Sequence, residues 1–356
     1  MSWLSRALGR HPKLVSAVIV VGLGASMWAA TDYIETVVRP REAQARQARI
    51  EGELAHADSL FGRDNFAEAL SEYRYLLDAF AADLAPAAVG QVHRGIGLCH
   101  VRLAAAGDAR PNLEAALASF EQALALREPA ADPAGYAAIE YLIGDAQRAL
   151  AAAEGDPAPL AAAIDSYQAG MAVLSADDDI DAYVAGLRSI GTVHRDLFVA
   201  DPDRHPMTEA MDLYDEALRR ANPLTHPAAH GDTLLEIGQA YVILSERGYV
   251  QRNLDRAIEA YNRALGVYTV DAFPRQHALV HKRLGDAYTR IAMTKPRNSN
   301  ERAAHQQRVI RAENLARTSY QIARSFGLAP EFDRADASGA APADDTAPAP
   351  DPGKSE

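Results

Sequence analysis

Cysteine and clustered basic residues are scarce in this sequence, and each absence excludes a class of protein. A single cysteine, Cys99, cannot form an internal disulfide or a cysteine-based zinc cluster, so we interpret it as a small core side chain rather than a reactive thiol. The 48 acidic and 36 basic residues give a net charge of −12. Because phosphate binding needs clustered Lys and Arg, this balance argues against nucleic acid as the main ligand.

Long uncharged runs are also scarce, and only residues 14–31 form one, with 18 residues free of charge. As a helix this run would be about 27 Å long, at about 1.5 Å per residue, which just spans a bilayer core. Arg6, Arg10 and Lys13 before it and Trp28 near its end are typical membrane flanks. We therefore predict an uncleaved transmembrane signal-anchor helix rather than a buried soluble helix.

The charges beside this run indicate its orientation. The basic residues before it lie within a few positions, whereas Asp32 and Glu35 follow it directly and the next arginines begin at Arg39. This asymmetry favours a cytoplasmic N-terminus. We expect a single-pass protein of a bacterial inner membrane whose remaining chain is periplasmic.

A fixed period of 47 residues organises the chain that follows. Glycines recur at this interval in one set of predicted helices, as Gly97, Gly144, Gly191, Gly238 and Gly285. Alanines recur with the same step in a second set, as Ala69, Ala116, Ala163, Ala210 and Ala257. Each alanine is followed four residues later by an aromatic residue: Tyr73, Phe120, Tyr167, Tyr214 or Tyr261. Self-similarity at such a period predicts stacked helical repeats.

The spacing inside each copy predicts two packed helices. Apolar or small residues at Leu254, Ala257, Ile258, Tyr261 and Leu265 form one face of an amphipathic helix, and the earlier copies repeat the pattern. A glycine lets two helices approach closely, and we expect a bulky aromatic side chain to fill the adjoining space. Prolines mark the predicted starts of the first helices, at Pro86, Pro133, Pro227 and Pro274, with Ile180 at the remaining position.

The period ends before the chain does. Gly285 is followed 19 residues later by Ala304, but then by Arg308 where an aromatic residue is expected. We predict a closing helix over about 299–326, and an Ala-, Pro- and Asp-rich tail that is disordered. The expected organisation is a short N-terminal segment (1–13), the membrane helix (14–31), a connector (32–50), the repeat domain (51–328) and the tail (329–356).

Glycine or alanine on the first helix, and alanine followed by an aromatic residue on the second, resemble the tetratricopeptide (TPR) repeat over roughly residues 56–288. The usual TPR period is about 34 residues. The longer form, with NLDRAIEAYNRAL and LGDAY at 253–265 and 284–288, is similar to TPR arrays that precede bacterial CHAT protease domains, although no such domain follows. The resemblance implies an all-α, right-handed α-solenoid of about six helix pairs that binds proteins. HEAT and armadillo repeats share the length range but lack this signature.

Two sets of residues look catalytic, and we interpret both as structural. His194–Leu197 spell the start of a kinase catalytic loop, but Asp201 stands where a metal-binding Asn belongs and no glycine-rich phosphate loop exists. His226 with His230, and His277 with His281, are spaced to share one helix face, as metal ligands are, but no third ligand is evident. We therefore predict no enzyme activity, no metal and no cofactor.

Basic residues on the predicted first helices form a candidate binding groove. In the TPR family, ligands lie along positions three before and four or five after the glycine. The residues here are Arg94, Arg102, Arg148, Arg188, Arg195, Lys282 and Arg290. Such a groove would accept carboxylates of a partner through charge-assisted hydrogen bonds. The alternative is a solvated face whose charges pair with one another.

The function predicted from the sequence is a membrane-anchored, non-catalytic scaffold or adaptor in a cell-envelope complex. Its expected partners are proteins, either an acidic segment or other membrane subunits. The alternative is a structural subunit that assembles with its own copies. A third hypothesis, an enzyme that uses the histidine pairs, requires bound metal.

Overall fold

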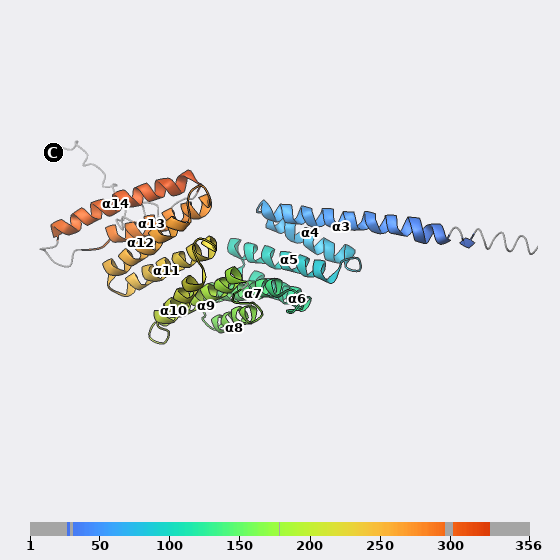
Figure 1. The fold of residues 1–356 in the computed structure, drawn as a ribbon, viewed down its shortest axis with the longest axis horizontal. Coiled ribbons are helices and arrows are strands. Elements are labelled where there is room, and N and C mark those ends of the chain that lie inside the picture. Colours follow the sequence, from blue (N-terminus) through green and yellow to red (C-terminus); the bar gives the residue numbers. More distant parts are fainter. Residues whose placement is uncertain (1–26, 29–30, 178, 296–301, 328–356) are drawn as a thin grey trace, which may run out of the picture. The chain divides into compact units, whose positions relative to one another are not determined.

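The computed structural model describes residues 27–28, 31–177, 179–295 and 302–327, and within these ranges every regular element is a helix (Figure 1). The chain divides between Arg127 and Glu128 into two compact units. In both units the helices pack as neighbouring pairs, each consisting of a first and a second helix. The predicted all-α class is therefore confirmed, and the pairing is consistent with an α-solenoid.

The first unit contains two helix pairs. A π-helical segment, η1 (Ile34–Val38), leads into α3 (Arg39–Gly62), which pairs with α4 (Phe66–Phe80), and α5 (Pro86–Ala106) pairs with α6 (Ala109–Ala125). Its core includes Tyr73, Leu76, Val92 and the fully buried Cys99. Helix α3 passes through most of the predicted connector, because that stretch is rich in Arg, Glu, Gln and Ala, which favour helix.

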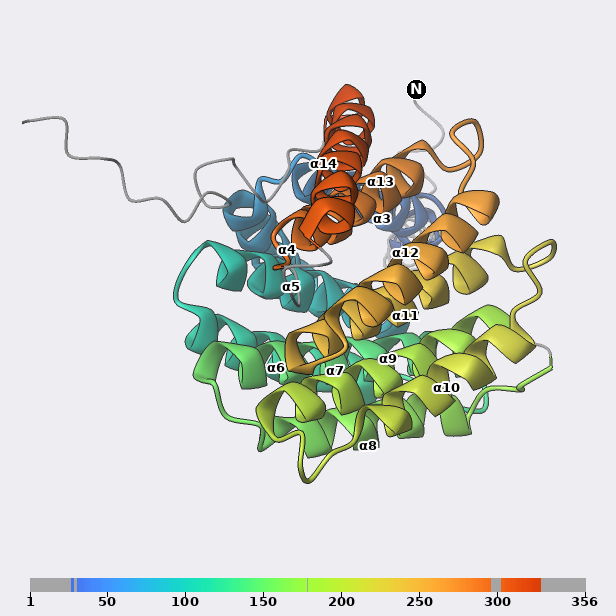
Figure 2. The same cartoon turned by 90° about the vertical axis from the view of Figure 1, so that its left-hand side faces the viewer.

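The second unit contains four helix pairs, α7/α8, α9/α10, α11/α12 and α13/α14, which follow one another in sequence order (Figure 2). The second helices α8, α10 and α12 each pack between their own first helix and the next one, and α9 also contacts α7 and α11. The bounds are α7 (Pro133–Glu154), α8 (Pro159–Ala172), α9 (Ile180–Ala200), α10 (Met207–Arg220), α11 (Pro227–Arg247), α12 (Val250–Val267), α13 (Pro274–Ala292) and α14 (Arg302–Ser325).

The first helices begin where the sequence predicts. Helices α5, α7, α11 and α13 start at a proline, and α9 starts at Ile180, so that all five starts are 47 residues apart. Proline suits this position because the first turn of a helix leaves its N–H groups unpaired. The predicted helix starts are confirmed.

Each repeat glycine packs against the aromatic ring of its own second helix. A Cβ atom placed on Gly144 would lie 2.7 Å from Tyr167, and one on Gly191 would lie 2.7 Å from Tyr214. Gly97 meets Phe120 and Gly238 meets Tyr261 in the same way. The absence of a side chain therefore makes room for a ring that is almost completely buried.

The sixth pair repeats this contact with a shifted spacing. Gly285 packs against Tyr320, and a Cβ atom there would lie 2.5 Å from the ring. Ala316, four residues before Tyr320, is buried as the repeat alanines are. It stands 31 residues after Gly285 rather than 19, which corresponds to an insertion of 12 residues between the two. The pattern is therefore not lost at Arg308, as the sequence suggested, but is restored later in α14.

The predicted membrane segment lies mostly outside the described residues. Of residues 14–31, only Met27, Trp28 and Thr31 are described, and residues 1–13 and 329–356 also fall outside. In the described part of the chain, no helix has the length and apolar character needed to cross a membrane.

Candidate functional site

In three of the repeats, the residue that follows the repeat glycine or alanine is an aspartate that accepts a hydrogen bond from the tyrosine opposite it. The hydroxyl of Tyr167 donates to Asp145 at 2.6 Å, and that of Tyr320 donates to Asp286 at 2.8 Å. Tyr73 donates in the same way to Asp58, which follows Ala57, at 2.5 Å. Where the aromatic residue is Phe120, which has no hydroxyl, the equivalent position is occupied by an apolar side chain, Leu98. These acidic residues are therefore parts of the helix interface.

Burial, followed by the charges and hydrogen bonds of nearby carboxylates, raises the pKa of Tyr73 and Tyr167. For Tyr167, burial is the largest cause and Asp145 adds to it, so its pKa lies well above the ordinary value. For Tyr214, burial raises the pKa to about 12. These hydroxyl groups are therefore neutral hydrogen-bond donors near neutral pH.

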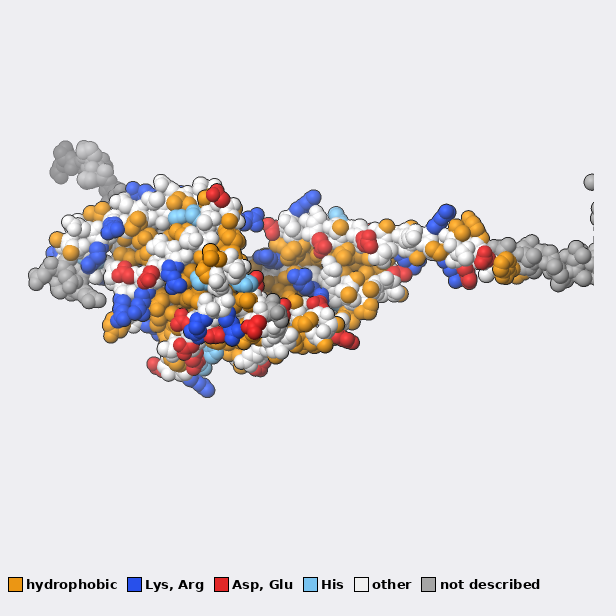
Figure 3. All heavy atoms as spheres, in the orientation of Figure 1, with side chains coloured by type: hydrophobic (Ala, Val, Ile, Leu, Met, Phe, Trp, Pro, Cys, Tyr) orange, Lys and Arg blue, Asp and Glu red, His pale blue; other side chains and the backbone are white. Residues whose placement is uncertain are grey.

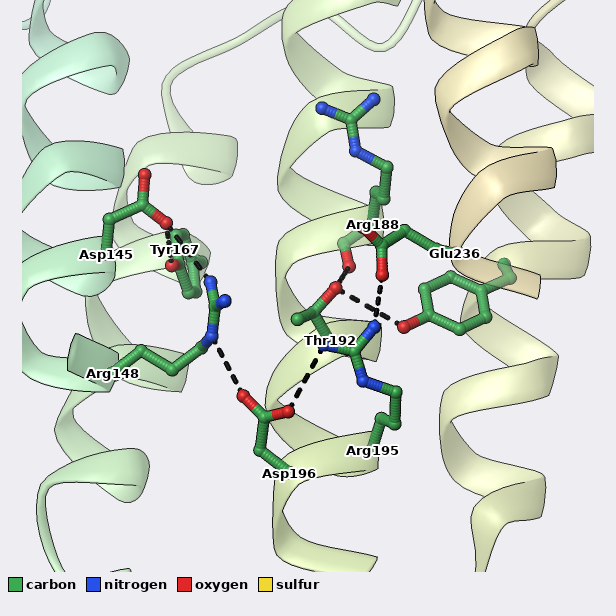
Figure 4. Close-up of polar contacts among 9 residues, drawn as sticks. Asp145, Arg148, Tyr167, Arg188, Thr192, Arg195, Asp196 and Glu236 are labelled. Atoms are coloured by element: carbon green, nitrogen blue, oxygen red, sulfur yellow. Dashed lines mark hydrogen bonds and ion pairs between the residues drawn. The ribbon is translucent and has the colours of Figure 1, made fainter. Parts of the chain in front are cut away.

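Charged side chains link three first helices in what we call the first-helix ladder, consisting of Asp145, Arg148, Asp196, Arg195 and Glu236 (Figure 4). Arg148 Nε on α7 lies 2.9 Å from Asp196 Oδ2 on α9, and Arg195 Nη2 lies 3.2 Å from the other oxygen of Asp196. Arg195 Nη1 also contacts Glu236 Oε2 on α11. Opposite charges therefore alternate from one helix to the next.

Arg195 is the most enclosed cation of the ladder, with 11% of its side chain exposed. Burial alone would lower its pKa, but the charges of Glu236 and Asp196 help to raise it overall. The guanidinium is therefore charged and depends on these two carboxylates.

Further polar contacts connect the first helices beside the ladder. Arg188 on α9 lies 3.2 Å from Asp232 on α11, and Asp232 also accepts a hydrogen bond from Tyr268 at 2.5 Å. Arg290 on α13 lies 2.6 Å from Glu246 on α11. On the visible face of the second unit, acidic and basic side chains are intermingled (Figure 3).

The structure gives the seven predicted groove residues different surroundings. Arg148, Arg188, Arg195 and Arg290 form ion pairs with carboxylates of neighbouring first helices, and Lys282 is half-buried on α13. Arg94 and Arg102 belong to the first unit, and the guanidinium of Arg102 lies 5.9 Å from the centre of the Phe66 ring. These contacts favour the alternative reading of a face whose charges pair with one another, and a partner at these residues stays a prediction.

The histidine pairs make structural contacts. Nδ1 of His230 lies 2.7 Å from the carbonyl oxygen of Ala221, and Nδ1 of His277 lies 2.8 Å from that of Tyr268. Because a carbonyl oxygen only accepts, each Nδ1 must donate. The two contacts are equivalent, one period apart, and tie a first helix to the end of the preceding second helix. Among the described residues, no group of three His, Cys, Asp or Glu side chains is placed to hold a metal ion.

The kinase-like tetrapeptide lies inside helix α9, where the sequence placed it. Its Arg195 and Asp196 are members of the first-helix ladder, and its His194 lies 2.8 Å from Glu209 of α10. All three side chains therefore contact neighbouring helices.

A cavity of about 850 Å³, which we call the terminal cavity, lies where four helices of the last two pairs meet. Its volume is within the range of small-ligand and peptide pockets. It is lined from the end of α11 by Ser245 and Glu246, from the start of α12 by Tyr249, Val250, Gln251 and Leu254, from the end of α13 by Arg290, Met293, Thr294 and Lys295, and from the start of α14 by His305 and Arg308.

The terminal cavity is cationic in an otherwise acidic protein. Among the described residues that line it, Arg290, Lys295 and Arg308 are the cations other than histidine and Glu246 is the one carboxylate, which already pairs with Arg290. Within the described ranges, no ion pair engages Lys295 or Arg308, and both side chains are exposed. The insertion in the sixth pair contributes to this arrangement, since His305 and Arg308 lie on the part of α14 that precedes the restored repeat contact.

Tyr249 gives the cavity an exposed aromatic wall in an unusual backbone conformation. Its φ of 47° and ψ of 40° are left-handed, a region that a bulky residue rarely adopts, and 77% of the residue is exposed. The equivalent residue three periods earlier is Asp108, for which this conformation is easier. Asn253 Nδ2 holds the turn by donating to the Gly248 carbonyl at 2.9 Å. Together with the half-exposed Met293, Tyr249 offers an apolar contact beside the cations.

Solved structures resemble this chain at low sequence identity. No protein-family model matches the chain, and no curated protein matches it. The crystal structure of BtubC (BKLC) from P. vanneervenii aligns with a TM-score of 0.43 and 16% identity, over 86% of this chain and 99% of that one. The apo form of the quorum sensor NprR from B. thuringiensis aligns with a TM-score of 0.47 and 12% identity, over 91% of this chain and 78% of that one. Likenesses at this level carry no functional argument.

Proposed function

We propose that this chain is a non-catalytic docking scaffold of the TPR type, a right-handed solenoid that binds an acidic segment of a partner protein in the terminal cavity. The observation that carries the proposal is the cavity itself, with the exposed cations Lys295 and Arg308 beside the exposed apolar side chains of Tyr249 and Met293. The repeated Gly–aromatic contacts supply a stack of helices whose last pairs hold these groups in place.

The chemistry of the cavity specifies a partner that is both acidic and partly apolar. Arg308 can form paired charge-assisted hydrogen bonds with a carboxylate, and Lys295 can contribute a second positive charge. The Tyr249 ring and the Met293 thioether suit an apolar or aromatic side chain of the same segment. Arg290 contributes less, because Glu246 already neutralises it at 2.6 Å.

Anchoring of this scaffold to a bacterial inner membrane belongs to the proposal on sequence grounds, through residues 14–31 and their basic flank. Fractionation of cells that produce the full chain, with and without charged substitutions in this run, tests it. Extraction of the unsubstituted chain by salt alone would contradict the anchor. Assembly with its own copies is the alternative function, and sedimentation of the purified full chain decides whether such assemblies form.

Fluorescence anisotropy of the full chain with a fluorescein-labelled Gly-Asp-Phe-Asp-Asp-Gly peptide tests the docking site. We expect saturable binding that weakens as salt rises, because exposed charges are screened. Arg308→Glu should weaken the binding by about tenfold or more, which corresponds to about 1.4 kcal/mol.

Arg317→Glu is the matched control, since it makes the same charge change at an exposed position on the opposite side of α14. We expect this variant to bind the peptide as the unsubstituted chain does. Equal weakening by both substitutions would show nonspecific attraction by the whole chain. Binding unaffected by Arg308→Glu would remove the terminal cavity from the proposal.

A further inference from the structure

We infer that the chain's own acidic segment, residues 328–356, occupies the terminal cavity through Asp344 and Asp345 and competes there with the partner. This inference rests on the proposed function, because it assigns a competitor to the same site. Three properties of the chain support it: charge complementarity, reach, and the advantage of an intramolecular ligand.

Charge complementarity distinguishes this segment from the rest of the chain. Residues 328–356 contain seven acidic and two basic side chains. Asp344 and Asp345 are adjacent, so two carboxylates arrive together at a cavity in which Lys295 and Arg308 are exposed and without an ion pair in the described part of the structure. Two carboxylates can therefore meet two cations.

The length of chain decides which carboxylates of this segment can reach the cavity. Arg308 is 17 residues before Ser325, where α14 ends, which is about 26 Å along the helix at about 1.5 Å per residue. Asp333 follows Ser325 by eight residues, which span at most about 26–29 Å when fully extended and leave no length for the reversal of direction. Asp344 follows by 19 residues, which span up to about 60 Å. Glu331 and Asp333 therefore fall short of the cavity, whereas the adjacent carboxylates of Asp344 and Asp345 reach it with length to spare.

Attachment to the same chain compensates for a modest number of contacts. A short tether places its ligand at an effective concentration of order millimolar, so even a weak contact is populated. If the segment fills about nine tenths of the cavities, the apparent Kd of a partner segment rises about tenfold. The consequence is a scaffold that releases its own segment when a partner of higher affinity arrives.

Zero-length carbodiimide crosslinking of the full chain, followed by mass spectrometry, tests the contact. The carbodiimide activates a carboxylate, and a nearby amine then displaces the activating group. An amide forms, and the carbodiimide leaves as a urea. The chain has four lysines, Lys13, Lys282, Lys295 and Lys354, which makes the products easy to assign. We expect Lys295 to be joined to Asp344 or Asp345. Mixing isotopically heavy and light protein distinguishes joining within one chain from joining between copies, and joining only between copies would overturn the inference.

Competition provides the second measurement, with the labelled Gly-Asp-Phe-Asp-Asp-Gly peptide as the probe. The full-length variant Asp344→Asn with Asp345→Asn should bind the probe about tenfold more tightly than the unsubstituted chain. Adding Arg308→Glu should abolish this gain. As the control, Asp351→Asn removes one carboxylate of the same segment and should change the affinity less than twofold.

The outcomes separate the two proposals. Equal probe binding by the unsubstituted chain and the Asp344/Asp345 variant, with Arg308→Glu weakening both, would overturn self-occupancy and leave the docking function supported. Failure of every protein, including the Asp344/Asp345 variant, to bind the probe would overturn the docking function and self-occupancy with it. A gain in affinity together with the Lys295 crosslink would support both.

Discussion

The first-helix ladder and the terminal cavity contain the same kinds of charged side chains, but they differ in what surrounds each cation. In the ladder, Arg148 and Arg195 have carboxylates within hydrogen-bond distance on the next first helix. In the cavity, Lys295 and Arg308 are exposed, and no ion pair of the described residues includes them. Charge of one sign therefore does not by itself identify a binding surface in a repeat protein, because the neighbouring repeat can supply the counter-charge.

The difference follows from position in the stack. A first helix in the middle of the second unit has a neighbour one period away, so an arginine on one first helix can meet a carboxylate on the next. Arg290 on the last first helix pairs back to α11 through Glu246. The start of α14, displaced by the 12-residue insertion, has no equivalent in earlier pairs, and none of the described residues forms an ion pair with its Arg308. A binding site therefore arises where the period is broken.

The largest expected effect comes from breaking the ladder at its most enclosed cation. Arg195→Ala leaves the partly buried Glu236 without its counter-charge and leaves Asp196 with Arg148 alone, and we expect the free energy of unfolding to fall by about 3 kcal/mol. Arg308→Ala in the cavity should change it by less than about 0.5 kcal/mol. Urea denaturation followed by circular dichroism measures the free energy of unfolding of both variants. Equal losses of stability would contradict the proposed difference between the ladder and the terminal cavity.

A smaller loss of stability is expected when a side chain is added to Gly285, the repeat glycine of the last helix pair. Gly285→Leu forces a side chain into the Tyr320 ring, and overpacking of this kind costs about 1–3 kcal/mol. Gly266→Leu is the matched control, because a Cβ atom at this exposed position of α12 meets nothing within 4 Å. If thermal unfolding shifts equally for both variants, α14 does not pack on α13 through the repeat contact.

A still smaller loss of stability, which depends on pH, is expected when the buried hydroxyl of Tyr167 is removed. Tyr167→Phe removes the hydrogen bond to Asp145 and should lower the free energy of unfolding by about 1 kcal/mol at pH 7. Burial, and then Asp145, raise the folded-state pKa of Tyr167 above its unfolded value near 10. The stabilising contribution is therefore complete below pH 10 and is lost as pH rises above it. The variant should lose less stability between pH 9 and 11, and an unchanged pH profile would contradict this assignment.

Much of the fold could be predicted from the sequence, because the 47-residue period is carried by residues that pack. The packing of Gly191 against Tyr214 could be predicted from the sequence, since only a missing side chain leaves room for a buried ring. The restored contact between Gly285 and Tyr320 could not be predicted, because a single insertion shifts Tyr320 out of the 47-residue period. One Ala–aromatic pair outside the period is a weak signal. The Arg, Glu, Gln and Ala residues of 39–50 already favoured a helix there, but the sequence did not show that this connector is continuous with the first helix of the first pair.

The candidate site was harder to predict, because it depends on which charges find partners. The sequence placed Arg148, Arg188 and Arg195 on first helices, but it could not show that Asp196, Asp232 and Glu236 lie beside them. Two signals for the terminal cavity were nevertheless present. Tyr249 replaces the aspartate of an equivalent turn, and the period breaks between Gly285 and Ala316.

The smallest expected effect is a gain of stability, and it concerns the turn at Tyr249. Asn tolerates the left-handed conformation of Tyr249 better than Tyr does, so Tyr249→Asn should raise the free energy of unfolding by about 0.5–1 kcal/mol. The same change removes the aromatic wall and should weaken binding of the labelled acidic peptide about fivefold. Asp108→Asn, at the equivalent turn of the first unit, should change neither quantity. A variant that is more stable but binds less well would show that the strain at Tyr249 is kept for recognition, whereas unchanged binding would mean that the ring does not contact the ligand.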